Sequence, residues 1–177
     1  MSSHELLLIG EHRRTLDQRH RLSIPTEMSE QIQSKGPELI LAKERPGCLS
    51  LWSANPWQEH LQRGVTWVAD KLKAGKLEHQ TNQLLQLGRL LSTRHVPIQL
   101  AGRGRLVIPE GFREFLGVEP GGTVFVVGAS VSVELWHPER WVEYLNQQMP
   151  EFRELFEELS NLQTKQPARL QYDYLHY

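Results

Sequence analysis

The length and composition of the chain exclude several classes of protein. Its 177 residues, of which 39% are hydrophobic and 23% charged, are typical of one compact globular domain, or of two small domains that share a core. No apolar run approaches the roughly 18–20 residues that a membrane span needs, and the amino terminus makes a poor signal peptide, so no membrane partner is expected. The single cysteine, Cys48, excludes an internal disulfide framework and fits a reducing cytosol.

Charge is distributed unevenly along the chain. Residues 9–25 carry four arginines against two acidic residues, and residues 89–113 carry five arginines against one. Residues 131–160 carry seven acidic residues against two arginines. The formal net charge of −1 therefore argues against a globally basic nucleic-acid binder, but the gradient permits a localised anion-binding face.

The first third of the chain predicts short strands and helices in a definite order. Strands are expected at 12–16, 22–24, 38–43 and 48–52, with a polar, arginine-bearing turn between the first two. Pro25 fits the first turn of a short helix over Thr26–Gln33, since its missing N–H is not needed there. A further helix is expected to enter at Asn55-Pro56-Trp57.

The same order of elements returns after a helical segment. Residues 58–90 predict helices, because "WVADKL" and "NQLLQLGRLL" place apolar residues at i, i+3 and i+4. Strands then follow at 96–100, 106–108, 123–127 and 131–136, with a short helix at 110–117. A last helix, over about 138–160, carries the acidic excess, and residues 163–177 predict a loosely ordered tail.

An internal repeat with a spacing of 84 residues explains this order. "LDQRHRLSIP" at 16–25 aligns with "LAGRGRLVIP" at 100–109, and six of the ten positions are identical. At the same offset Leu51-Trp52 aligns with Leu135-Trp136, and Trp57 with Trp141. The four tryptophans are expected to be packing anchors. Two separated matches in one register indicate a duplicated unit of about 50 residues.

The duplication predicts a fold class. Neither unit can bury its strands alone at this size, so we expect the two copies to pair about a pseudo-two-fold axis and form one closed, mixed barrel. The predicted class is α+β and β-rich, with linking and C-terminal helices. The expected division of the chain is a first unit at 5–57, a helical connector at 58–90, a second unit at 91–141, and a C-terminal helix and tail at 142–177.

The paired motifs resemble those of the MraZ family of bacterial transcriptional regulators, which have two tandem AbrB/SpoVT-type swapped-hairpin units. The likeness covers roughly residues 5–147. It implies a double swapped-hairpin, AbrB-like barrel without catalytic activity or cofactor, which binds direct repeats in promoter DNA and assembles into a ring-like homo-oligomer. It also implies a cytoplasmic, nucleoid-associated protein, with repression of division and cell-wall genes as the family default, and no small-molecule substrate.

Carried over residue by residue, the resemblance places DNA contacts in the two turns. It gives Arg21 with Arg19 and His20 in the first turn, and Arg105 with Arg103 in the second. Arg13 and Arg14 add positive charge beside the first turn, so the first unit is expected to contribute more to DNA binding. Arginine suits this task because its fork of donors matches phosphate and guanine edges. Arg19 and Arg21 are expected to point to one face of a strand end.

The sequence also departs from the family pattern. Ala101 stands where the second motif usually has aspartate, so Asp17 is expected to orient its own turn rather than to contact DNA. His20 stands where the first turn usually has glycine, which predicts a different turn shape because a side chain resists positive φ.

Other interpretations remain open at this point. In one alternative, Asp17 and Arg21 form an ion pair that stabilises the turn or a subunit contact and has no role in DNA binding. The whole chain can be an AbrB-like protein-binding module, of an antitoxin or assembly type, whose acidic C-terminal extension binds another protein. The eight histidines show no metal-ligand spacing, so no metal site is expected, and no motif favours an enzyme.

Overall fold

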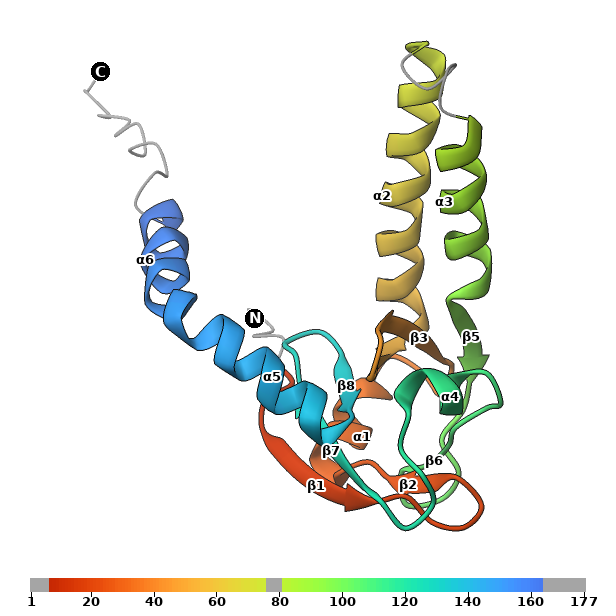
Figure 1. The fold of residues 1–177 in the computed structure, drawn as a ribbon, viewed down its shortest axis with the longest axis vertical. Coiled ribbons are helices and arrows are strands. Elements are labelled where there is room, and N and C mark those ends of the chain that lie inside the picture. The colour runs from red at the N-terminus through yellow and green to blue at the C-terminus, as the bar shows by residue number, and fades with distance from the viewer. Residues whose placement is uncertain (1–6, 76–80, 164–177) are drawn as a thin grey trace, which may run out of the picture. The chain divides into compact units, whose positions relative to one another are not determined.

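The computed structural model describes residues 7–75 and 81–163 (Figure 1). Its strands are β1 (Glu11–Thr15), β2 (Arg21–Ser23), β3 (Leu39–Arg45), β4 (Cys48–Ser53), β5 (His95–Ile98), β6 (Arg105–Val107), β7 (Thr123–Gly128) and β8 (Val133–Trp136). Its helices are α1 (Thr26–Ile32), α2 (Ala54–Lys73), α3 (Thr81–Thr93), α4 (Phe112–Leu116), α5 (Pro138–Gln148) and α6 (Phe152–Gln163), with a 3-10 turn, η1, at Met149–Glu151. The predicted α+β class is confirmed.

The described strands form one open sheet and one short ribbon. Six strands lie in the order β1-β7-β8-β4-β3-β5, and β2 pairs with β6 separately. Every pair of named strands in the described residues is antiparallel, so the expected mixed sheet is wrong. The reason is that tight hairpins and pairing about a two-fold axis both produce antiparallel neighbours. A closed barrel is not found among these strands.

Two of these antiparallel pairs reveal the internal symmetry. Leu22 of β2 lies opposite Leu106 of β6, and Ser50 of β4 lies opposite Glu134 of β8. In both pairs the residue numbers differ by 84, the spacing of the sequence repeat. A residue that faces its own repeat equivalent lies on the axis that relates the two copies. The pairing therefore places a local two-fold axis through the β2–β6 ribbon and through the centre of the sheet.

Backbone hydrogen bonds between the two turns obey the same symmetry. The N–H of Ile108 donates to the carbonyl of His20 at 2.9 Å, and the N–H of Ile24 donates to the carbonyl of Gly104 at 2.9 Å. Each bond is the 84-residue equivalent of the other. The two "Leu-x-Ile-Pro" segments thus cross, and each supplies a backbone hydrogen-bond partner to the other.

The hydrophobic core is built from both copies. Leucines and isoleucines of the repeated motif are 0–3% exposed, namely Leu16, Leu22, Ile24, Leu106 and Ile108. They belong to one cluster with the apolar faces of β3, β4, β7 and β8. Three of the predicted tryptophan anchors are confirmed as buried residues, with exposures of 3% for Trp57, 1% for Trp136 and 8% for Trp141.

Three expected helix boundaries were wrong. Helix α2 begins at Ala54 with Ser53 as N-cap, because the chain enters the helix directly from the end of β4. Helix α4 begins only at Phe112, since Gly111 before it has a left-handed φ of 82°. The single helix expected at 138–160 is divided into α5, η1 and α6, and Pro150 lies in the dividing turn because it lacks an N–H for the helical ladder.

The helices α2 and α3 belong to the same unit as the sheet. Contacts divide the chain into one unit up to Trp141 and a second unit from Val142 onward. Within the first unit, α2 and α3 both extend away from the sheet (Figure 1). Large apolar side chains on them are exposed, including Trp67 at 60% and Leu90 at 54%. The described helices include none that is long and apolar enough to cross a bilayer. The expected tail lies mostly outside the described residues.

Candidate functional site

The two arginine-bearing turns lie at opposite ends of the β2–β6 ribbon. Arg21 is opposite Val107 and Arg105 is opposite Ser23, while Leu22 and Leu106 between them are buried. Because alternate residues of a strand point to opposite faces, Arg21 and Arg105 share the face of the ribbon that lies away from the core. The local two-fold axis therefore brings the two predicted motifs together on one surface, which we call the turn surface, consisting of residues 17–23 and 101–107.

Asp17 organises the first turn. Its Oδ1 accepts hydrogen bonds from the backbone N–H groups of Arg19 at 2.8 Å and Arg21 at 2.9 Å. Its Oδ2 accepts the Nε–H of Arg21 at 2.7 Å, and the two side chains are 41% and 30% exposed. Partial burial acts to raise the pKa of Asp17, but the hydrogen bonds from Arg21 and Arg19 and the charge of Arg21 lower it below its usual value. The carboxylate thus closes the turn and holds the Arg21 side chain.

The second turn is closed without a carboxylate. Ala101 and Arg105 exchange two backbone hydrogen bonds, of 2.8 and 3.1 Å. Arg103 and Gly104 adopt left-handed φ values of 63° and 66°, which make this tight closure possible. The backbone therefore does in the second copy part of what the Asp17 side chain does in the first.

His20 adopts the left-handed backbone conformation of its repeat equivalent Gly104. It has a φ of 54°, close to the 66° of its repeat equivalent Gly104. The expectation that the His20 side chain resists a positive φ is therefore wrong: the hydrogen bond from Ile108 to the His20 carbonyl holds the strained conformation. The two turns still differ in shape at the preceding residue, because Arg103 has a left-handed φ of 63° and its repeat equivalent Arg19 does not. The Nδ1 atom of His20 is buried and has no hydrogen-bond partner in the described part of the chain.

The arginines of the turn surface and of the neighbouring strand β1 differ in how many contacts they make within the chain. Arg21 is paired with Asp17, and Arg14 donates to the carbonyls of Ser23 at 3.1 Å and Arg13 at 2.9 Å. Arg13 lies over the ring of Phe125, 5.2 Å from its centroid. On the turn surface, the side chains of three exposed arginines make no hydrogen bond or ion pair within residues 7–75 and 81–163: Arg19, Arg103 and Arg105.

The expected strand alternation of Arg19 and Arg21 is not realised. β2 covers only Arg21–Ser23, and Arg19 lies in the preceding turn, where His20 reverses the backbone. Side chains alternate between two faces only within a strand, so strand geometry does not place Arg19 and Arg21 on a common face. The same holds for Arg103, which lies outside β6.

Sequence reasoning missed a polar network on the sheet. The indole N–H of Trp52 donates to Ser50 Oγ at 2.8 Å, and that hydroxyl donates to Glu44 Oε1 at 2.6 Å. In the second copy the indole N–H of Trp136 donates directly to Glu134 Oε2 at 2.8 Å. Burial, and then the nearby charge of Glu44, raise the pKa of Glu134. A polar residue two positions before the repeated tryptophan was the available signal.

The described residues offer neither a metal site nor a reactive cysteine. No group of three or more histidine, cysteine or acidic side chains there could hold a metal ion. Cys48 is buried, and burial raises the pKa of its thiol well above the ordinary value. Since the thiolate is the reactive form, this cysteine is a buried apolar side chain rather than a nucleophile.

Comparison with known proteins gives consistent matches. Residues 95–169 match the family model described as "MraZ protein, putative antitoxin-like". The chain is 28% identical over 156 residues to the transcriptional regulator MraZ of Thermoanaerobacter sp. (strain X514), which covers 88% of this chain and 99% of that protein. It is 25% identical to the MraZ regulator of Syntrophomonas wolfei and 26% identical to that of Clostridium acetobutylicum, each again over 88% of this chain and 99% of the relative.

These matches agree with the paired turns that the structure brings together. The relatives align along most of the chain, including both copies of the repeat, whereas the family model covers the second copy and the helices after it. The second copy and the helices after it are thus similar to the MraZ family model, and most of the chain is similar to proteins named transcriptional regulator MraZ.

Proposed function

We propose that this protein is a DNA-binding transcriptional regulator that contacts DNA through the turn surface. The relatives are named transcriptional regulators, which supports the general role. The observation that carries the specific proposal is the pairing of the two motifs across the β2–β6 ribbon, with three exposed arginines that make no described contact within the chain. Guanidinium groups left free on one surface of a nearly neutral protein suit phosphate and base contacts.

The contacts that the arginines make within the chain change which of them we expect to contribute most to DNA binding. Arg21 and Arg14 are engaged by Asp17 and by backbone carbonyls, so they support the turn as much as they offer charge. Two of the three free arginines, Arg103 and Arg105, lie in the second copy. We therefore propose that the second turn contributes at least as much to DNA binding as the first, the reverse of the order expected from the sequence.

Assembly is part of the proposal. The two repeats together would form one swapped-hairpin, AbrB-like unit, with residues 58–90 as connector and 142–177 as C-terminal extension. Several such chains would form a ring-like homo-oligomer in which the turn surface recurs and meets repeated sites in a promoter. Weak contacts from each subunit would then add through effective concentration. A cytoplasmic, nucleoid-associated repressor of division and cell-wall genes is the role that the resemblance implies.

The experiment compares promoter DNA with scrambled DNA of equal length by fluorescence anisotropy at physiological salt. Wild-type protein should bind its own upstream promoter more tightly, and Arg103→Ala and Arg105→Ala should each weaken binding. Arg63→Ala is the matched control, since Arg63 lies on α2 and bonds only the Glu59 carbonyl among the described residues. Equal affinity for both DNAs would contradict specific binding. Light scattering should report a multiple of the 20.5 kDa chain.

A second candidate is a protein-binding module of antitoxin or assembly type. It is favoured by the apolar side chains that α6 leaves exposed, with 62% exposure at Phe152 and 63% at Phe156. This candidate predicts that Phe152→Ser and Phe156→Ser abolish a protein partnership but leave DNA affinity unchanged. It also predicts that the arginine variants leave promoter occupancy as it is, which separates the two candidates.

A further inference from the structure

The two copies of the repeat differ at one buried tryptophan in a way that points to a ligand. Trp57 and Trp141 are repeat equivalents, and each packs against the tryptophan that precedes it, with ring centroids 5.7 and 5.2 Å apart. In the second copy the indole N–H of Trp141 donates to the carboxylate of Glu11 at 2.9 Å. A buried indole normally finds such an acceptor.

The repeat equivalent of Glu11, which lies in the first copy, is His95 of the second copy. Their residue numbers differ by 84, and the strand pairing agrees once an extra residue in β3 is allowed for. β3 has an irregularity between Lys43 and Arg45, so Ala42 corresponds to Val127. His95 indeed faces Ala42, as Glu11 faces Val127. The carboxylate of Glu11 beside Trp141 is therefore replaced by the imidazole of His95 beside Trp57.

This replacement leaves buried nitrogen atoms without partners. Trp57 is 3% exposed, and its Nε1 has no acceptor in the described residues. The same holds for Nδ1 of His95, whose ring centroid lies 5.2 Å from that of Trp57. A polar atom left unpaired in the interior destabilises the folded protein, so two such atoms side by side point to an acceptor from outside the described residues.

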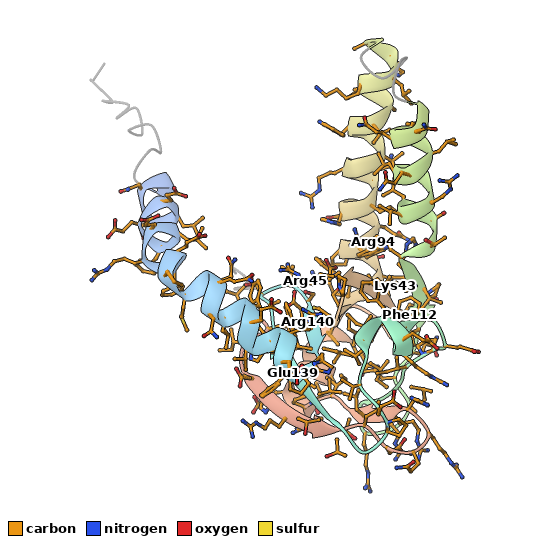
Figure 2. All side chains as sticks on the ribbon, in the orientation of Figure 1. Lys43, Arg45, Arg94, Phe112, Glu139 and Arg140 are labelled. Carbon is orange, nitrogen blue, oxygen red and sulfur yellow. The ribbon has the colours of Figure 1, made fainter. Side chains whose placement is uncertain are left out.

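A third nitrogen joins them from the residue before His95. Arg94 is the repeat equivalent of Gly10, and its guanidinium carbon lies 5.4 Å from the centroid of the Trp57 ring. One terminal nitrogen reaches Glu44 at 3.3 Å, but the Nε–H is buried and has no partner. Figure 2 shows Arg94 at the foot of α2, beside β3. Compared with the surroundings of Trp141, those of Trp57 have one negative charge fewer and one positive charge more.

We infer that Trp57, Arg94 and His95 form a carboxylate-binding site, which we call the orphan-donor site. Tryptophan and arginine always carry an N–H at these atoms, and histidine carries one on Nδ1 in its imidazolium form or in one neutral tautomer. The ligand class follows from the second copy, in which a carboxylate occupies the equivalent position beside Trp141. Hydrogen bonds from a charged donor to a carboxylate are about twice as strong as neutral ones.

Two sources can supply that carboxylate. The Arg94 side chain is 31% exposed, so its guanidinium is the part of the site that meets solvent. One source is a small free carboxylate. The other is an acidic side chain of a second copy of this chain, for which α6 offers the exposed residues Glu154, Glu157 and Glu158. The chemistry is the same in both cases, and the experiment separates them.

The test uses the full-length protein labelled with 5-fluorotryptophan and 19F NMR. Trp57→Phe assigns the Trp57 resonance, and the Trp141 resonance is the internal control because Glu11 already occupies its site. Titration with sodium acetate, against sodium chloride at equal ionic strength, should shift the Trp57 resonance to saturation and leave Trp141 unchanged. His95→Glu supplies a carboxylate from within, so it should weaken acetate binding at least about tenfold.

The variant Glu154→Gln/Glu157→Gln/Glu158→Gln identifies the second source. If a neighbouring copy fills the site, the Trp57 resonance of the variant differs from that of wild type before acetate is added, and acetate then restores it. If the source is a free carboxylate, the two proteins give the same resonance and the same titration. A Trp57 resonance that is identical in wild type, in the variant and in acetate overturns the inference, as does a chloride response of equal size. Either of these two contradicting results would assign an ordered water molecule to the buried donors.

Discussion

Gly104 and His20 occupy equivalent places in the two turns. We predict that Gly104→Ala and His20→Gly have opposite effects on the stability of the protein. A Cβ added at Gly104 would lie 2.9 Å from both Cβ and Oγ of Ser29 and 3.1 Å from the carbonyl oxygen of Ile24, at a φ of 66°. Left-handed strain costs about 1–2 kcal/mol, and overpacking costs about 1–3 kcal/mol. Gly104→Ala should therefore destabilise the protein by about 2–5 kcal/mol.

His20→Gly should change stability far less, and in the other direction. It removes the left-handed strain at φ 54° and a buried unpartnered Nδ1, while it adds backbone entropy of about 0.5–1 kcal/mol to the unfolded chain. A net gain of up to about 1 kcal/mol is expected. Urea unfolding followed by tryptophan fluorescence, at one fixed protein concentration, measures both. A Gly104→Ala midpoint equal to wild type would refute the steric reasoning, and a strong loss in His20→Gly would show that the imidazole stabilises its turn.

Three further outcomes are expected. Leu106→Ala, at a position that is 0% exposed, should cost about 3–5 kcal/mol by urea unfolding, and a loss below 1 kcal/mol would contradict its place on the axis. For Asp17→Asn, because the folded pKa of Asp17 is lowered, wild type should exceed the variant in stability at neutral pH, and the difference should disappear as pH falls below about 4. For Glu134→Gln, because the folded pKa of Glu134 is raised, wild type should lose stability relative to the variant as pH rises above about 4.3, and parallel stability–pH curves would refute this.

The repeat was the part of the fold that the sequence predicted best. The identical leucines, isoleucines and prolines of "LDQRHRLSIP" and "LAGRGRLVIP" are positions where burial constrains the side chain, so they survive in both copies. The axis through Leu22/Leu106 and Ser50/Glu134 follows from that repeat. The openness of the sheet was not predicted, because strand order depends on which edges pair and not on local pattern.

The candidate site was predicted only in part. Sequence reasoning located both turns, but not which arginines the chain itself engages. The bonds from Arg14 to the Ser23 and Arg13 carbonyls depend on how β1 passes β2, which no local motif encodes. The left-handed φ of His20 also could not be predicted, since a tertiary hydrogen bond holds it against the preference of the residue.

The orphan-donor site illustrates a different limit. Two of its residues, Arg94 and His95, align with Gly10 and Glu11 at the 84-residue spacing, so these two differences between the copies are visible in the sequence. Its meaning is not, because only the structure shows that Glu11 accepts from Trp141 and that nothing described accepts from Trp57.

The salt dependence of promoter binding tests the central claim most directly. The slope of log K against log salt falls by about 0.9 for each phosphate contact that is removed. If Arg19, Arg103 and Arg105 each contact a phosphate, the triple variant to alanine should show a slope shallower by about 2.7 than wild type, with Arg63→Ala unchanged. A triple variant with the wild-type slope and affinity would contradict DNA binding through the turn surface.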